Sequence, residues 1–233
     1  MPLFGLYIDP MYIIMMIPGF ILAAWASIKV KRTFSRYSRV RSSSGMTGAQ
    51  IAREILKRNN VHDVQVVETR GMLSDHYDPR KRVVRLSPDV YGTPSVSAIA
   101  VAAHEVGHAL QHAAHYAPLA LRSAAVPIAR IGSWGPWIII IGGFWFHMLE
   151  AVYLGVILFL GLVAFQLITL PVEFNASTRA RHQLEGLGLV DGRDAAGVRK
   201  VLSAAAMTYV AAAIATVMQL LYYLMLLSGR SDD

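Results

Sequence analysis

Four long apolar stretches run through the chain and are separated by more polar sequence. Each approaches the roughly 20 helical residues that are needed to cross a hydrocarbon core about 30 Å thick. The second stretch reaches that length only if it begins near Ile128 rather than at Trp134. The pattern therefore predicts four transmembrane helices, at residues 11–30, 128–149, 151–170 and 207–227.

The first apolar stretch has a competing interpretation as a cleaved signal peptide. A signal peptide carries basic residues before its apolar run. Here no Lys or Arg precedes the run, and a basic block follows it. We therefore predict that this stretch is a membrane span that remains in the protein.

The pattern changes to that of a small folded part between the first and second spans. Thr47 and Gln50 predict the capping box of a helix, and β-branched residues predict strands at residues 64–67 and 82–86. A further helix is expected to begin at Ser95 or Ser97, either of which can cap it, and to end near residue 116, just before a proline. This part is expected to be α+β.

Composition agrees with a membrane protein. The chain is 55% hydrophobic and only 16% charged, against about 25% charged residues in soluble proteins. It contains no cysteine, so the side chains that bind any metal must be His, Asp or Glu. The predicted fold class is a mainly α membrane protein with four transmembrane helices and a small α+β part, divided into residues 1–30, 31–127, 128–171, 172–206, 207–227 and a tail at 228–233.

The net charge of +7 is concentrated beside the first span, where six of the thirteen residues from Lys29 to Arg41 are basic. An excess of Lys and Arg marks the cytoplasmic flank of a span. We therefore predict an integral inner-membrane protein with both termini outside and with residues 31–127 and 172–206 in the cytoplasm. Nucleic-acid binding is the disfavoured alternative, because aromatic interleaving and a recognisable fold are missing; the lipid bilayer is the simpler partner.

The helix beginning near Ser95 carries the motif H-E-x-x-H as His104, Glu105 and His108. Residues four apart project from the same face of a helix, so the two imidazoles can bind one zinc ion, and Glu105 can take a proton from a zinc-activated water. A chance match on an apolar helix is the alternative, since the five-residue pattern alone is only moderately specific. His112 and His115 are left out of the predicted metal ligands.

A catalytic zinc site needs a third protein ligand and one position for water. Glu173 is the candidate, because it is expected to begin a polar helix directly after the third span. Two spans separate His108 from Glu173, and an even number returns the chain to the same side of the membrane. A carboxylate that only favours the helix dipole is the alternative interpretation of Glu173.

These features together resemble the YugP-type neutral zinc metallopeptidases, a family of bacterial membrane proteins, and more distantly the heat-shock membrane metallopeptidases. The resemblance implies a zincin-like fold with His104, His108 and Glu173 as zinc ligands and Glu105 as general base. The segments that carry it are Leu73–Pro79, Arg85–Ser87, Ala102–His112 and Leu170–Phe174.

The sequence departs from many glutamate-ligand zincins at one position. Those enzymes place an Asp four residues after the Glu, where it orients a zinc histidine, whereas this chain has Ser177 there and its nearest amide is Asn175. Either side chain can accept a hydrogen bond from an imidazole. The group that stabilises the oxyanion is left open among His76, Tyr77, Arg179 and Arg181.

The predicted function is hydrolysis of peptide bonds by a membrane-embedded zinc metallopeptidase, with a polypeptide substrate that lies in or near the membrane. The 82–86 strand is expected to pair with an extended substrate by strand addition. A non-catalytic zinc-containing scaffold or adaptor is the alternative from another class. A transporter is disfavoured, because His147 and Glu150 fall at a turn and not within a span. The oligomeric state is left open.

Overall fold

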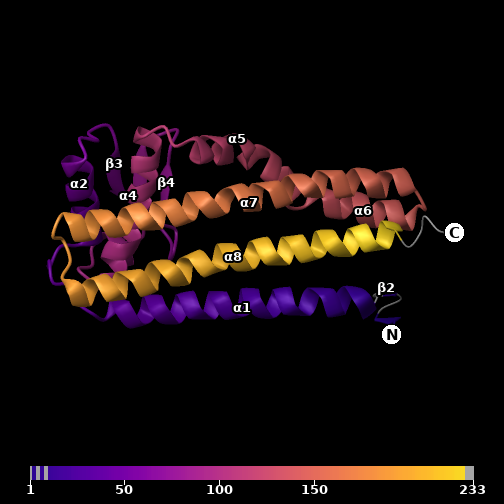
Figure 1. The fold of residues 1–233 in the computed structure, drawn as a ribbon, viewed down its shortest axis with the longest axis horizontal. Coiled ribbons are helices and arrows are strands. Elements are labelled where there is room, and N and C mark those ends of the chain that lie inside the picture. Colours follow the sequence, from indigo (N-terminus) through magenta and orange to yellow (C-terminus); the bar gives the residue numbers. More distant parts are fainter. Residues whose placement is uncertain (1, 4–5, 8–9, 229–233) are drawn as a thin grey trace. The chain divides into compact units, whose positions relative to one another are not determined.

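The computed structural model describes residues 2–3, 6–7 and 10–228, and its elements are labelled in Figure 1. The chain divides into two compact units. The apolar unit comprises Met1–Ala26, Leu121–Leu170 and Thr208–Asp233, and the mixed unit comprises Ser27–Ala120 and Pro171–Met207. Of the predicted tail at residues 228–233, only Ser228 lies within the described residues.

The predicted number of spans is confirmed. Four helical segments of the described chain are long and apolar enough to cross a membrane, and only 17% to 33% of their most apolar windows is buried within the protein. Their outward-facing apolar side chains suit a lipid environment. The chain is therefore a mainly α membrane protein whose spans belong to α1 (Pro10–Ser38), to α5 (Ala117–Gly132) with α6 (Gly135–Trp145), to α7 (Leu149–Gly186) and to α8 (Gly192–Ser228).

Helices α7 and α8 extend farther than the sequence predicted. Glu173 does not begin a new helix, because α7 continues through Pro171 to Gly186. The polar loop expected at residues 186–197 is shortened to residues 187–191. Pro171 removes one backbone donor, but buried side chains such as Leu184 hold the following turns of α7 in the core of the mixed unit. Tertiary packing thus outweighs the local signal of the proline.

The second span is built from two helices. α5 ends at Gly132 and α6 begins at Gly135. Pro136 lies in the first turn of α6, where its missing N–H leaves no intrahelical bond unmade. A short antiparallel pair near the N-terminus, β1 (Pro2–Leu3) and β2 (Leu6–Tyr7), was not predicted.

Both predicted strands exist, as β3 (Gln65–Glu68) and β5 (Val83–Leu86). A third strand, β4 (His76–Asp78), lies in the connection that was expected to be a loop. The sheet order is β3-β5-β4, with β3 parallel and β4 antiparallel to β5. The central β5 has both edges paired, so the expectation that it pairs with a substrate is wrong. β3 and β4 lie at the two edges of the described sheet and either can accept another strand; β4 packs against α4.

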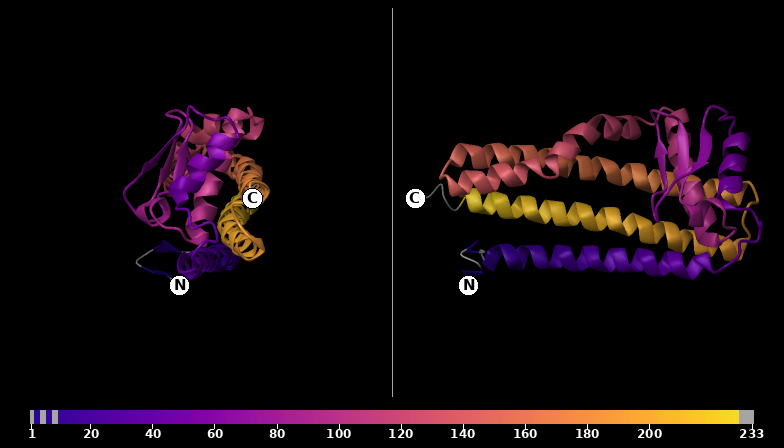
Figure 2. Two further views of the ribbon diagram at one scale, coloured as in Figure 1. Left: turned by 90° about the vertical axis from the view of Figure 1, so that its left-hand side faces the viewer. Right: turned by 180° about the vertical axis from the view of Figure 1, so that it is seen from behind.

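The sheet and α2 (Gly48–Arg58) pack on the helix that carries the H-E-x-x-H motif, α4 (Val96–Ala113) (Figure 2). The capping box of α2 is confirmed, since the Gln50 N–H donates to Thr47 Oγ1 and the Thr47 N–H donates to Gln50 Oε1. Ser95 is the cap of α4. The short helix α3 (Pro88–Tyr91) joins β5 to this layer.

The end of α4 was predicted three residues too late. The helix stops at Ala113, and His115 adopts a left-handed backbone conformation with φ of 51°. The chain then starts α5 at Ala117, so the proline at residue 118 lies in the first turn of a new helix instead of marking a loop.

Gly107 lets α4 and α7 approach closely within the mixed unit. A Cβ atom at this position would lie 2.6 Å from the backbone oxygen of Ala176 and 3.1 Å from its carbonyl carbon. A backbone carbonyl cannot swing away as a flexible side chain can. The glycine therefore offsets its poor helix propensity, about 1 kcal/mol relative to alanine, by bringing the two helices together.

Replacing Gly107 by alanine should push α4 away from α7. We expect the free energy of unfolding to fall by about 1–3 kcal/mol, the usual cost of overpacking, which thermal unfolding of the purified protein would measure. Gly186→Ala is the matched control, because a Cβ atom there meets nothing within 4 Å. Equal thermal stability of the two variants would contradict the close contact.

Candidate metal centre

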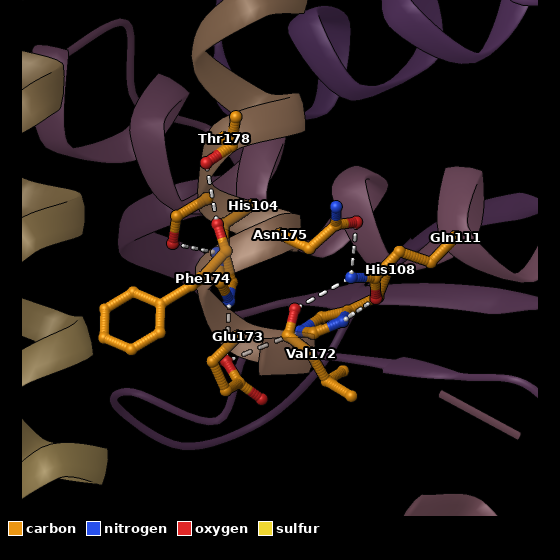
Figure 3. Close-up of polar contacts among 9 residues, drawn as sticks. His104, His108, Gln111, Val172, Glu173, Phe174, Asn175 and Thr178 are labelled. Carbon is orange, nitrogen blue, oxygen red and sulfur yellow. Dashed lines mark hydrogen bonds and ion pairs between the residues drawn. The ribbon is translucent and has the colours of Figure 1, made fainter. Parts of the chain in front are cut away.

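Three side chains from two helices converge in the mixed unit (Figure 3). His104 and His108 project from α4, and Glu173 projects from α7. Glu173 Oε2 lies 3.2 Å from His104 Nε2 and 3.7 Å from His108 Nε2. Their candidate ligand atoms all lie within 4.8 Å of one another. The structure thus brings together the three residues that the sequence nominated.

Each histidine is held through its other ring nitrogen. His104 Nδ1 lies 3.2 Å from Ser177 Oγ, and His108 Nδ1 lies 3.0 Å from Gln111 Oε1. An acceptor at Nδ1 places the ring proton there and leaves the lone pair of Nε2 for a metal. Both imidazoles therefore present a ligand atom to the same point as the Glu173 carboxylate.

Gln111 is the residue that the sequence analysis missed. Its side chain is fully buried, and its Nε2 donates to Val172 O at 2.8 Å and to Asn175 Oδ1 at 3.0 Å. Because a carbonyl oxygen can only accept, the amide presents Nε2 to Val172 and Oε1 to His108. Gln111 lies three residues after His108, and this spacing on one helix face was the available signal.

The other nominated polar residues lie around this network or farther from it. Asn175 does not orient a histidine; it accepts from Gln111 and, at 2.8 Å, from Arg179 Nε. His76 is an exposed residue of β4 with Nδ1 2.8 Å from Ser74 O. Arg181 has a buried Nε without an acceptor among the described residues.

The side chain of Tyr77 contacts α4 one turn after the H-E-x-x-H motif. Its hydroxyl lies 2.8 Å from His112 Nδ1. Burial, with a contribution from Asp78, raises the pKa of Tyr77 to about 12, and burial lowers the pKa of His112. Both groups are therefore uncharged at neutral pH. His112 is held by this contact, and its exclusion from the metal ligands stays a prediction.

Glu173 and His108 shift each other's pKa in opposite directions. Burial alone would raise the pKa of Glu173, but hydrogen bonds with His104 and His108 outweigh it and hold that pKa far below its usual range. Burial alone would lower the pKa of His108, but Glu173 and Glu105 outweigh it and raise that pKa. The carboxylate of Glu173 and the imidazole of His108 therefore each favour the charged form of the other.

Glu105 is buried on α4 beside His104. Its charge acts on His108, so it lies close enough to the centre to influence a group bound there. A carboxylate in this place is available to accept a proton.

Comparisons with known proteins agree with this geometry. A family model described as "Putative neutral zinc metallopeptidase" matches residues 12–228. The chain belongs to this family. It is also 49% identical over 224 residues to a protein of Bacillus subtilis (strain 168) named "Putative membrane protease YugP", covering 96% of this chain and 100% of that protein. No solved structure matches the chain.

The donor set fits the metal that the family name specifies. Two imidazole nitrogens and one carboxylate oxygen are ordinary zinc ligands, and ligand atoms of a tetrahedral zinc lie about 3.3 Å apart. The observed separations of 3.2 and 3.7 Å are close to that spacing. Three protein ligands also leave the fourth position of a catalytic site. The resemblance to neutral zinc metallopeptidases that the motifs indicated is confirmed. The roles of the individual residues as zinc ligands and general base stay predictions.

If Gln111 orients a zinc ligand of this peptidase, its loss should weaken metal binding. Gln111→Leu leaves the Nδ1–H of His108 buried without its partner, so we expect a 10- to 100-fold lower zinc affinity. Competition with a chromogenic chelator would measure this affinity. Ser177→Ala is the companion variant at His104 and should have a smaller effect, since its longer contact is partly exposed. An unchanged zinc affinity in Gln111→Leu would show that Gln111 does not orient a zinc ligand.

Proposed function

We propose that the chain is a zinc-dependent endopeptidase of the cytoplasmic membrane. The observation that carries the proposal is the convergence of His104, His108 and Glu173, each with its ligand atom directed inward, beside the buried Glu105. Membership of a zinc metallopeptidase family supports the same conclusion. A zinc ion held by these ligands supplies Lewis acidity, since it lowers the pKa of a coordinated water to about 7 and polarises a carbonyl.

The residues of the chain perform the proton transfers and the positioning. Glu105 accepts the proton of the attacking water and delivers it to the leaving amine. Gln111 and Ser177 keep His108 and His104 in the required orientation. The edge strand β4, which packs against α4, is the surface on which an extended polypeptide can add as a further strand.

A non-catalytic zinc-containing scaffold remains the second candidate. It would keep the same ligands as a structural site. However, structural zinc sites usually have four protein ligands, whereas catalytic sites have three, and the described residues supply three here. A scaffold also has no requirement for a carboxylate at residue 105.

The substitution Glu105→Gln separates these two candidates. The variant should bind zinc as the wild type does and lose hydrolysis by at least about 100-fold, because general-base catalysis contributes about 10²–10⁴-fold. We would measure zinc content and the cleavage of an unfolded reporter polypeptide by protein in lipid discs. Glu173→Ala should instead lose metal, since a ligand is removed.

Full hydrolysis by Glu105→Gln would refute the mechanism, and unchanged zinc content in Glu173→Ala would show that Glu173 is not a zinc ligand.

We propose that substrates lie in or near the membrane, since Glu173 follows the apolar run of α7 by only three residues. The same reporter carrying a transmembrane anchor should then be cleaved faster than the free form. Equal rates would argue against such substrates.

We further propose that the metal centre faces the cytoplasm and that both termini lie outside. Two observations support this orientation. The basic block from Lys29 to Arg41 marks a cytoplasmic flank. Between His108 and Glu173 the described chain has two membrane-length segments, α5–α6 and α7, and an even number returns it to one side.

The absence of native cysteine makes this topology directly testable. Lys57→Cys and Met148→Cys each introduce a single thiol at an exposed position. A membrane-impermeant maleimide added to intact cells should label the Met148→Cys variant at once. The Lys57→Cys variant should be labelled only after lysis. The reverse pattern would invert the proposed orientation.

A further inference from the structure

A basic cleft lies in the mixed unit, formed by the last part of α1 and the first turns of α8. Its volume is about 440 Å³. Four cationic side chains line it and no carboxylate does, and three hydroxyl-bearing residues lie among them: Lys29, Thr33, Arg36 and Tyr37 from α1, and Arg199, Lys200 and Ser203 from α8. The metal ligands are not part of this cleft.

The spacing of these residues gives each helix a polar stripe. On α1 they lie at positions i, i+4, i+7 and i+8 and share one helix face. On α8, Ser203 lies four residues after Arg199 and three after Lys200, so it neighbours both cations on the helix surface. Two cationic stripes that face a common space repel each other. Glu185 relieves part of this charge, since it lies 3.5 Å from Arg199 in an exposed ion pair. The arrangement is suited to an anion with several acceptor oxygens.

The walls of the cleft are fixed by close packing and hydrogen bonds. A Cβ atom at Gly197 would lie 2.9 Å from the ring of Tyr37 and 2.8 Å from Val96, so α8 lies tightly against α1 and α4. Asp194 near the start of α8 accepts from the N–H and the hydroxyl of Ser43, at 2.6 and 2.7 Å. The backbone positions that carry the cations are therefore held by packing within the mixed unit, so the helices need not move apart or together for a ligand to bind.

The position of the cleft along both helices indicates the source of the anion. Lys29 is the first charged residue after the apolar run of α1, and no charged residue follows Ser203 until after Leu227. On both helices the cleft thus adjoins an uncharged segment of membrane-spanning length. The anionic groups found at the end of such a segment are the phosphates of lipid headgroups.

We propose that this cleft binds the phosphate headgroup of an anionic phospholipid. Arg36 and Arg199 can each donate two hydrogen bonds to phosphate oxygens, Lys29 and Lys200 add charge, and Thr33 and Ser203 add hydroxyl donors. The site is separate from the metal centre and does not depend on the proposed peptidase activity.

The test is binding of fluorescent phosphatidylglycerol to the full-length protein in an uncharged detergent. Lys29→Gln/Arg36→Gln should weaken this binding by at least about tenfold, because two headgroup contacts are lost. Lys31→Gln/Arg32→Gln is the matched control: it removes the same charge from the same part of α1, from exposed residues that do not line the cleft. The control should bind phosphatidylglycerol nearly as tightly as the wild type does. Fluorescent phosphatidylcholine, which has no net charge, should bind to neither the wild type nor the control.

Three results would overturn the proposal. An equal loss in both double variants would show diffuse attraction to basic residues. Displacement of the probe by inorganic phosphate as effectively as by phosphatidylglycerol would identify a site for free phosphate, and tighter binding of a short single-stranded RNA would identify a nucleic-acid surface. Zinc content reports the folding of each variant. If the α1 variant does not fold, Arg199→Gln/Lys200→Gln tests the opposite wall in the same way.

Discussion

The architecture of the mixed unit depends on the carboxylate of Glu173, which is buried and needs positive charge near it. A buried carboxylate without a partner would cost several kcal/mol. The two imidazoles of α4 supply that partner, and they can do so only because α4 and α7 lie close together at Gly107 and Ala176. The candidate metal ligands and the helix packing are therefore parts of one arrangement.

The surrounding elements stabilise this arrangement in turn. The sheet and α2 pack on one side of α4 and bury its apolar residues, such as Ile99 and Val106. Gln111 links α4 to the backbone of α7 at Val172. The histidines are thus oriented by contacts that also hold the two helices together, so a change in helix packing changes the geometry of the centre.

The sequence predicted the parts of this structure that are encoded locally or by long runs. Uncharged stretches revealed the spans, Thr47 and Gln50 revealed a helix start, and H-E-x-x-H gave two candidate ligands. Glu173 could be nominated only by adding topology to the motif. The strand β4 was missed because three polar residues give no alternating pattern, and the length of α7 was missed because Pro171 signals an end that burial of later residues overrides. Gln111 was missed because the two partners that fix its amide, Val172 and Asn175, come from a helix more than sixty residues away.

The groups that orient the two histidines, a hydroxyl and an amide, carry no formal charge. A carboxylate in such a place makes an imidazole a stronger electron donor toward its metal. With neutral groups, a dication bound by His104 and His108 would receive less electron density and would keep more of its own positive character. Such an ion would polarise a carbonyl more strongly and would be held less tightly than one whose histidines face carboxylates.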